Sequence, residues 1–155
     1  MYGEDDDRKD LKNPTQLDSI DIKPVTLAHA RQKNKVYKKT LSVLFDTGAK
    51  YSCCKATISH MGNTKKKNEA TMFSTPNGIF ASNRSCELEF HLSEFSENRI
   101  LKWNFHLLPE SQKIPYDIIL GRDILKTLKI DISYSEDKVV WDNLSLQIQE
   151  IKFDK

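Results

Sequence analysis

Residues 43–49 read Val43-Leu44-Phe45-Asp46-Thr47-Gly48-Ala49, an apolar run that leads directly into a short polar turn. The apolar run predicts a buried strand, so the carboxylate of Asp46 would stand at the end of a rigid element. Glycine at position 48 permits close approach of backbone or substrate, and the Thr47 hydroxyl can bond neighbouring backbone and stiffen the turn. The stretch therefore predicts an exposed, rigidly held carboxylate of the kind that activates water.

A second element lies far downstream, at Ile118-Ile119-Leu120-Gly121-Arg122-Asp123. It joins an apolar run to a glycine and to a short segment, residues 122–129, whose apolar residues fall on one side of a helix. The first turn alone is also compatible with an ordinary strand connection, because Asp, Thr and Gly all favour turns. The two elements together, in this order, indicate a subunit of an aspartic protease.

The chemistry of such a site requires more than one turn. Cleaving a peptide bond with water and no metal calls for two carboxylates that share one proton, one acting as base and the other as acid. The chain contains a single Asp-Thr-Gly, so the second carboxylate must come from a second copy across a two-fold axis. We therefore expect a homodimer. An aspartyl-phosphate nucleophile is disfavoured, since that site needs a lysine beside the aspartate and a parallel α/β sheet.

The rest of the chain predicts an all-β protein. Four stretches have the pattern of short strands: residues 86–92, 101–107, 138–141 and 144–148. A polar loop at 93–98 joins the first two, and a turn at Asp142-Asn143 joins the last two. His91 and His106 fall on the polar face of their strands, so we expect both to face solvent. Many short strands, one short helix and no βαβ repeat favour a barrel or a sandwich.

Composition excludes several classes of partner. At 155 residues the chain is long enough for one domain with a core, and its formal net charge of +2 is too small to imply nucleic acid. No apolar run approaches the ~20 residues of a membrane helix. The acidic N-terminus lacks the apolar core of a secretory signal. We expect neither a membrane nor a nucleic-acid partner.

The domain organisation follows from local composition. Residues 1–25 are acidic with few apolar anchors and predict a flexible arm or precursor remnant, and residues 26–155 form the predicted protease domain. The basic stretch 31–39 is typical of a solvated hairpin or edge strand, and Lys65-Lys66-Lys67 of a loop tip. Neither basic run carries the interleaved aromatics that stacking on nucleic acid requires.

The cysteines and histidines predict no metal site. They never fall at the short paired spacings of structural zinc: Cys53, Cys54, Cys86, His29, His60, His91 and His106. Three cysteines, two of them adjacent, make a poor disulfide framework. We expect small buried apolar groups in a reducing compartment.

These motifs resemble those of the retroviral-type aspartic proteases (retropepsins), most closely those of gypsy-like LTR retrotransposons, over about residues 36–149. The matching parts are the catalytic loop 45–49 with Ser52 after it, a flap at 72–80, a strand and helix entry at 105–109 and 116–123, and C-terminal strands at 130–134 and 139–142. The resemblance implies a closed β-barrel, corresponding to half of an acid protease, with one short C-terminal helix and a homodimeric site.

The resemblance also implies roles for individual residues. Asp46 would be catalytic, with Thr47, Gly48 and Ala49 supporting its loop. The flap would include Thr75, Pro76, Asn77, Gly78 and Ile79, and the brace Leu120, Gly121, Arg122 and Asp123. The implied activity is endopeptidase cleavage of an extended polypeptide, without cofactor or metal. The implied role is processing of a Gag-Pol-type polyprotein, in the cytoplasm or within virus-like particles of a retroelement.

One position departs from the family pattern. Retroviral members usually carry an acid two residues after the loop glycine, where it pairs with the arginine of the Gly-Arg element. Here that position is Lys50, so Arg122 would need another partner, either Asp123 or a residue of the other subunit. The competing interpretation of the chain is a non-catalytic retropepsin-like module for dimerisation or peptide binding. The intact catalytic loop favours the enzyme.

Overall fold

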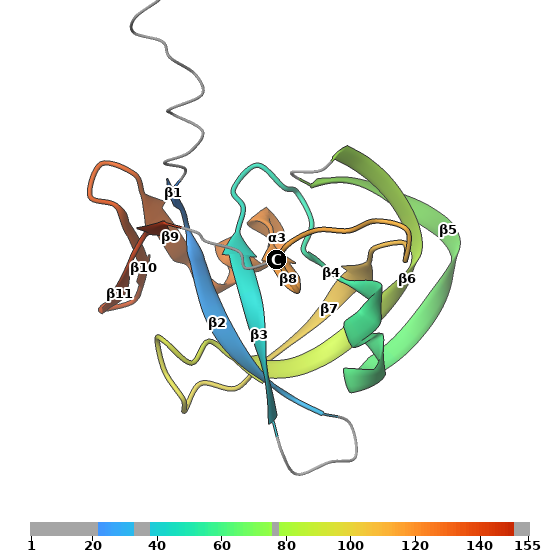
Figure 1. Ribbon diagram of the computed structural model, residues 1–155, viewed down its shortest axis with the longest axis horizontal. Helices are drawn as coiled ribbons and strands as arrows, with labels where there is room; N and C mark the ends of the chain where they lie inside the picture. Colours follow the sequence, from blue (N-terminus) through green and yellow to red (C-terminus); the bar gives the residue numbers. More distant parts are fainter. Residues whose placement is uncertain (1–21, 33–37, 76–77, 151–155) are drawn as a thin grey trace, which may run out of the picture.

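The computed structural model describes residues 22–32, 38–75 and 78–150, and these consist mostly of strands (Figure 1). The strands are β1 (Ile22–Lys23), β2 (Val25–Arg31), β3 (Lys38–Phe45), β4 (Cys53–Cys54), β5 (Asn63–Thr75), β6 (Gly78–His91), β7 (Leu101–Leu107), β8 (Ile118–Leu120), β9 (Ile130–Ser133), β10 (Lys138–Trp141), β11 (Leu144–Gln147) and β12 (Gln149–Glu150). The all-β prediction is confirmed. Residues 1–21, most of the predicted arm, lie outside the described residues, so the arm stays a prediction.

The predicted helix is present as α3 (Arg122–Leu128). It ends where Lys129 adopts a left-handed conformation with φ of 60°, and the Lys129 N–H bonds to carbonyls of the last turn. A second, 3-10 helix, η1 (Ala56–Met61), was not predicted. Its buried residues are Ile58 and Met61 only, and one pair three residues apart is too short a pattern to recognise in sequence.

The largest sheet closes into a barrel. Its strands follow the order β2-β3-β8-β4-β7-β6-β5, and β6 also pairs with β2. The closing contact consists of two pairs, His29↔His91 and Ala30↔Phe90. The long β5–β6 hairpin extends from this barrel on one side, and the three-stranded sheet of β9, β10 and β11 lies on the opposite side (Figure 1). The predicted closed barrel is confirmed.

Period-two alternation builds the core as expected. In the β6–β7 pair, Leu88, Phe90 and Phe105 are buried and contribute to one large apolar cluster. A smaller cluster, which includes Leu44, lies on the other face of β3. Hydrophobic burial of this extent is the main favourable term for folding. The C-terminal hairpin of β10 and β11 is also confirmed, with the turn at Asp142, where φ is 58°.

Three surface assignments from the sequence are wrong. His91 is only 4% exposed, because the segment after β6 folds back and places Glu97 against the ring. His106 is half-buried between aromatic rings rather than facing solvent. Lys65-Lys66-Lys67 lies within strand β5, not at a loop tip, although the three residues are exposed as predicted for a basic run. Within the described residues, no helix is long and apolar enough to cross a membrane.

We predict that the thiols of the folded protein are unreactive. Burial raises the pKa of Cys53 to about 12, helped by the negative charges of Asp46 and Asp123, and burial raises the pKa of Cys54 well above its usual range. Because the thiolate is the reactive form, a thiol reagent such as DTNB at pH 8 should label neither residue in the native state. The same protein in guanidinium should titrate all three cysteines. Rapid labelling of either Cys53 or Cys54 in the folded protein would contradict this.

Candidate active site

Asp46 lies at the junction of two parallel strands. β3 and β8 pair in parallel with Phe45 opposite Leu120, and the Asp46 N–H continues the ladder by donating to the Leu120 carbonyl at 2.9 Å. The Gly48 N–H donates to Asp46 Oδ1 at 2.9 Å, so the turn itself holds the carboxylate. Asp46 is half-buried, whereas Thr47 and Gly48 are exposed. The arrangement presents one oriented carboxylate at the rim of the barrel.

A close backbone contact lies behind this turn. A Cβ added at Gly121 would be 2.7 Å from the backbone C and O of Tyr51 and 2.8 Å from the Ala49 carbonyl oxygen, so no side chain fits there. That proximity lets the Arg122 N–H donate to the Ala49 carbonyl at 2.8 Å. Ala49 itself is buried. The two sequence elements that predicted the site are therefore in direct contact.

The structure identifies a partner for Arg122. Its Nη1 donates to the Thr47 carbonyl oxygen at 3.0 Å, so the guanidinium holds the backbone of the catalytic-type turn directly. Asp123, one of the two alternatives from the sequence, bonds elsewhere. Lys50 is exposed, and its ammonium lies 5.3 Å from the centre of the Tyr51 ring. A backbone carbonyl therefore takes the place of the missing acid.

Ser52 and Asp123 tie the loop to the start of α3. The buried Ser52 hydroxyl donates to Asp123 Oδ1 at 2.6 Å and accepts from the Gly121 N–H at 2.9 Å. The Ser52 N–H donates to Asp123 Oδ2 at 3.1 Å, and the Ile124 N–H donates to Asp123 Oδ1 at 2.7 Å. An acid in the first turn of a helix is also favoured by the helix dipole. The Asp123 carboxylate thus accepts a hydrogen bond from a backbone N–H at the start of α3 and also positions the loop that contains Ser52.

The predicted flap residues fall on the end of the β5–β6 hairpin. Thr75 pairs with Gly78, where φ is +128°, a conformation that favours glycine. Ile79 is 71% exposed. Pro76 and Asn77 lie outside the described residues. The hairpin is present, and its function as a flap remains a proposal.

His106 links the catalytic-type loop to this hairpin. Its ring lies edge-on to Tyr51, with ring centres 5.2 Å apart, and stacks on Phe73 of β5 at 5.4 Å. Burial lowers the pKa of His106, the positive charge of Lys67 lowers it further, and Asp123 opposes both. The imidazole is therefore neutral near pH 7 and acts here as an aromatic spacer. The sequence could not show this, because the contact joins β5, β7 and the loop before β4.

Asp117 is a second brace that the sequence did not single out. Its Oδ2 accepts from the Ser42 N–H at 2.9 Å, and the Asp117 N–H donates to the Ser42 carbonyl at 3.1 Å. Lys55 lies 3.6 Å from the other carboxylate oxygen. These contacts join β3 and the residue after β4 to the residue before β8. The position of Asp117, directly before the buried apolar run of β8, was the sequence signal that could have identified this brace.

This chain is similar to known proteins. The sequence model of the family described as retroviral aspartyl protease matches residues 27–133. Among solved structures, EIAV protease in complex with the inhibitor HBY-793 is similar, with 23% identity, a TM-score of 0.49 and coverage of 72% of this chain and 92% of that chain. The retroviral protease-like domain of Ddi1 from Leishmania major has 18% identity, a TM-score of 0.48 and coverage of 82% and 90%. The curated proteins include no significant match.

We predict that Gly121→Ala destabilises the fold and that Gly48→Ala does so far less. The added methyl at position 121 meets backbone that cannot move without shifting the loop, an overpacking that costs about 1–3 kcal/mol or more. At position 48 the nearest atom is Asp46 Oδ1 at 3.3 Å, a side-chain atom that can yield. Urea unfolding at one fixed protein concentration measures both free energies. Equal stability of the two variants would show that the contact is not as tight as described.

Proposed function

Because the chain belongs to the retroviral aspartyl protease family, we propose that it is an aspartic endopeptidase whose active site forms between two copies of the chain. The observation that carries the proposal is the position of Asp46. It follows directly after a core strand, on a turn held by Leu120, Gly48 and the Arg122 guanidinium. A carboxylate held this firmly is preorganised for catalysis and needs little rearrangement when the substrate binds.

The proposed dimer follows from the number of such turns. The sequence has one Asp-Thr-Gly, and hydrolysis by this route needs two carboxylates. The exposed Thr47 and Gly48 leave the outer side of the turn accessible to a second copy. In the proposed dimer, Thr47 of each copy braces the opposite turn, and the two Asp46 carboxylates approach closely enough to share one proton.

The proposed reaction divides acid and base roles between the two aspartates. The ionised Asp46 removes a proton from water, whose oxygen attacks the carbonyl carbon of the scissile peptide bond. The protonated Asp46 of the other copy donates its proton to the carbonyl oxygen, which gives a tetrahedral diol. The first Asp46 then passes the proton that it took from water to the amide nitrogen, while the Asp46 of the other copy takes a proton from one diol hydroxyl. The C–N bond breaks, the carbonyl re-forms as a carboxylic acid, and the amine and acid products leave.

We propose that the substrate is an extended polypeptide bound beneath the β5–β6 hairpin. Such a segment can gain strand-like backbone hydrogen bonds. Met72 and Ile79, which are 63% and 71% exposed, leave apolar surface on one face of the hairpin, and Phe73 on the other face packs against His106. Closure of this hairpin as a flap would exclude water. Processing of a retroelement polyprotein, in the cytoplasm or within virus-like particles, is the biological role that we propose.

We predict that Asp46→Asn abolishes peptide cleavage and leaves the fold intact. Asparagine can still accept the Gly48 hydrogen bond but cannot serve as base or acid, so kcat/KM should fall at least about 10³-fold. Asp131→Asn, at an exposed aspartate of β9, is the matched control and should retain full activity. Cleavage of a peptide library, with circular dichroism of each variant, measures both.

Two outcomes would contradict the enzymatic proposal. Substantial cleavage by purified Asp46→Asn protein would mean that another group performs the reaction. Peptide binding without cleavage by the parent protein would favour the competing function, a non-catalytic dimerisation or peptide-binding module. A statine-type transition-state mimic that inhibits the parent protein would support the enzyme, because such compounds occupy the position between two catalytic aspartates.

We also predict that specific activity falls as the protein is diluted. Only dimers hold both aspartates, so activity per chain should follow the dimer fraction as mass action requires. Activity and light scattering would be measured over the same series of concentrations. If specific activity stayed constant where scattering shows only monomer, a single chain would be sufficient for catalysis and the shared site would be excluded.

A further inference from the structure

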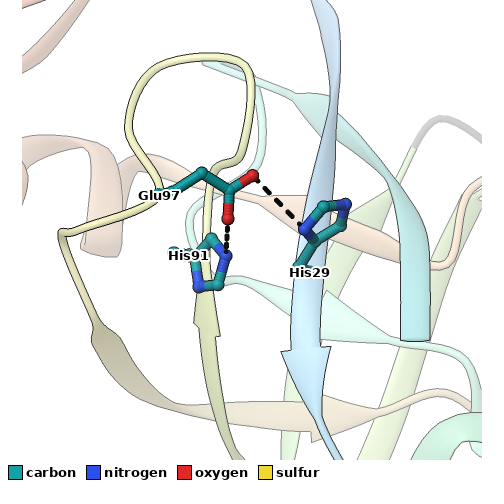
Figure 2. A group of neighbouring side chains, drawn as sticks. All are labelled: His29, His91 and Glu97. Carbon is teal, nitrogen blue, oxygen red and sulfur yellow. Dashed lines mark hydrogen bonds and ion pairs between the residues drawn. The ribbon is translucent and has the colours of Figure 1, made fainter. Parts of the chain in front are cut away.

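Two histidines and a glutamate meet where the barrel closes. The register of β2 and β6 places His29 directly opposite His91, and Glu97, in the segment after β6, lies against both rings (Figure 2). Glu97 Oε1 is 2.6 Å from His91 Nε2, and Oε2 is 3.5 Å from His29 Nδ1. Figure 2 shows one carboxylate oxygen directed at each imidazole. None of the three residues belongs to the candidate active site.

The spacing of the three groups suits a metal ion. One ligand atom from each residue can be chosen so that all lie within 4.8 Å of one another. Tetrahedral zinc with bonds of about 2.0–2.1 Å needs ligand atoms roughly 3.3 Å apart. The His29–Glu97 separation of 3.5 Å is already close to that value, and the His91–Glu97 separation of 2.6 Å must lengthen. The Glu97 side chain is 55% exposed, so it has room to move outward.

The donor set selects the class of ion. Two imidazole nitrogens and one carboxylate oxygen suit Zn²⁺ and related transition metals, whereas Ca²⁺ and Mg²⁺ prefer ligands that are all oxygen. An open pocket of about 390 Å³ beside the cluster leaves space for water as a further ligand. The neighbouring cation, Arg31, lies 3.6 Å from Glu89, and that pairing offsets its repulsion of a metal.

We propose that His29, His91 and Glu97 bind one divalent transition-metal ion, Zn²⁺ by preference, with water completing the coordination. The ion would link β2, β6 and the segment after β6. The strands meet there through only two residue pairs, and the same segment carries Phe95, which packs edge-on against Phe45 and Trp141. Metal binding would therefore secure the closure of the barrel and stabilise the fold, independently of peptide cleavage.

The test is titration of tag-free, metal-free protein with Zn²⁺ by calorimetry and with Co²⁺ by absorption spectroscopy. The parent protein should bind one ion per chain, show the visible bands of four-coordinate Co²⁺, and unfold at a higher temperature when Zn²⁺ is saturating. His29→Gln and Glu97→Gln should each weaken binding at least about tenfold, the lower limit seen even for outer-shell changes. His91 stays intact, because changing a buried side chain risks unfolding the protein.

Two control variants locate the ion. His60→Gln, at an exposed histidine of η1, and Asp46→Asn, which removes the proposed catalytic carboxylate, should both bind Zn²⁺ as the parent does. Absence of saturable binding by the parent would overturn the proposal. So would a loss of binding in Asp46→Asn, or equal affinity in Glu97→Gln and His60→Gln. None of these readouts depends on proteolysis.

Discussion

The contact between the backbone at Gly121 and the loop after Asp46 is the constraint on which the candidate site depends. Tyr51 and Ala49 lie so close to Gly121 that a single methyl group has no space. This approach sets the distance from the catalytic-type turn to the start of α3, and so allows Arg122 to reach both the Ala49 and Thr47 carbonyls. The bonds of Asp46 to Leu120 and Gly48 are local to the turn, whereas both bonds from Arg122 depend on this close approach.

The support is made of backbone groups and one buried side-chain network rather than of surface ion pairs. The guanidinium of Arg122 binds a carbonyl, and Asp123 is occupied by the buried Ser52 and the helix start. Charge-assisted hydrogen bonds are shorter and stronger than neutral ones, whereas an exposed ion pair contributes only about 0–1 kcal/mol. A lysine at position 50 is tolerated because the arginine does not need an acid in this arrangement.

A second constraint on the fold is the contact that closes the barrel. Six strands form a closed circuit, and its final contact, between β2 and β6, is short. Three polar side chains lie at this contact, with Glu97 against both His29 and His91. Burying His91 beside a carboxylate satisfies a polar group that would otherwise be costly to bury. The imidazole nitrogens and the carboxylate oxygens of these three residues are also the ligand atoms of the proposed metal site.

The sequence by itself determined the local features of this protein. Alternation in residues 86–107 predicted the β6–β7 pair, and the apolar runs before Asp46 and Gly121 predicted both halves of the candidate site, because these signals arise from neighbours along the chain. Only the tertiary structure decided what lies across strands. It placed His29 against His91, gave Arg122 the Thr47 carbonyl as its partner and buried residues expected at the surface. The physical reason is that strand register and loop folding bring together residues that are far apart in sequence. The spacing of residues along the chain does not indicate which of these distant residues will be in contact.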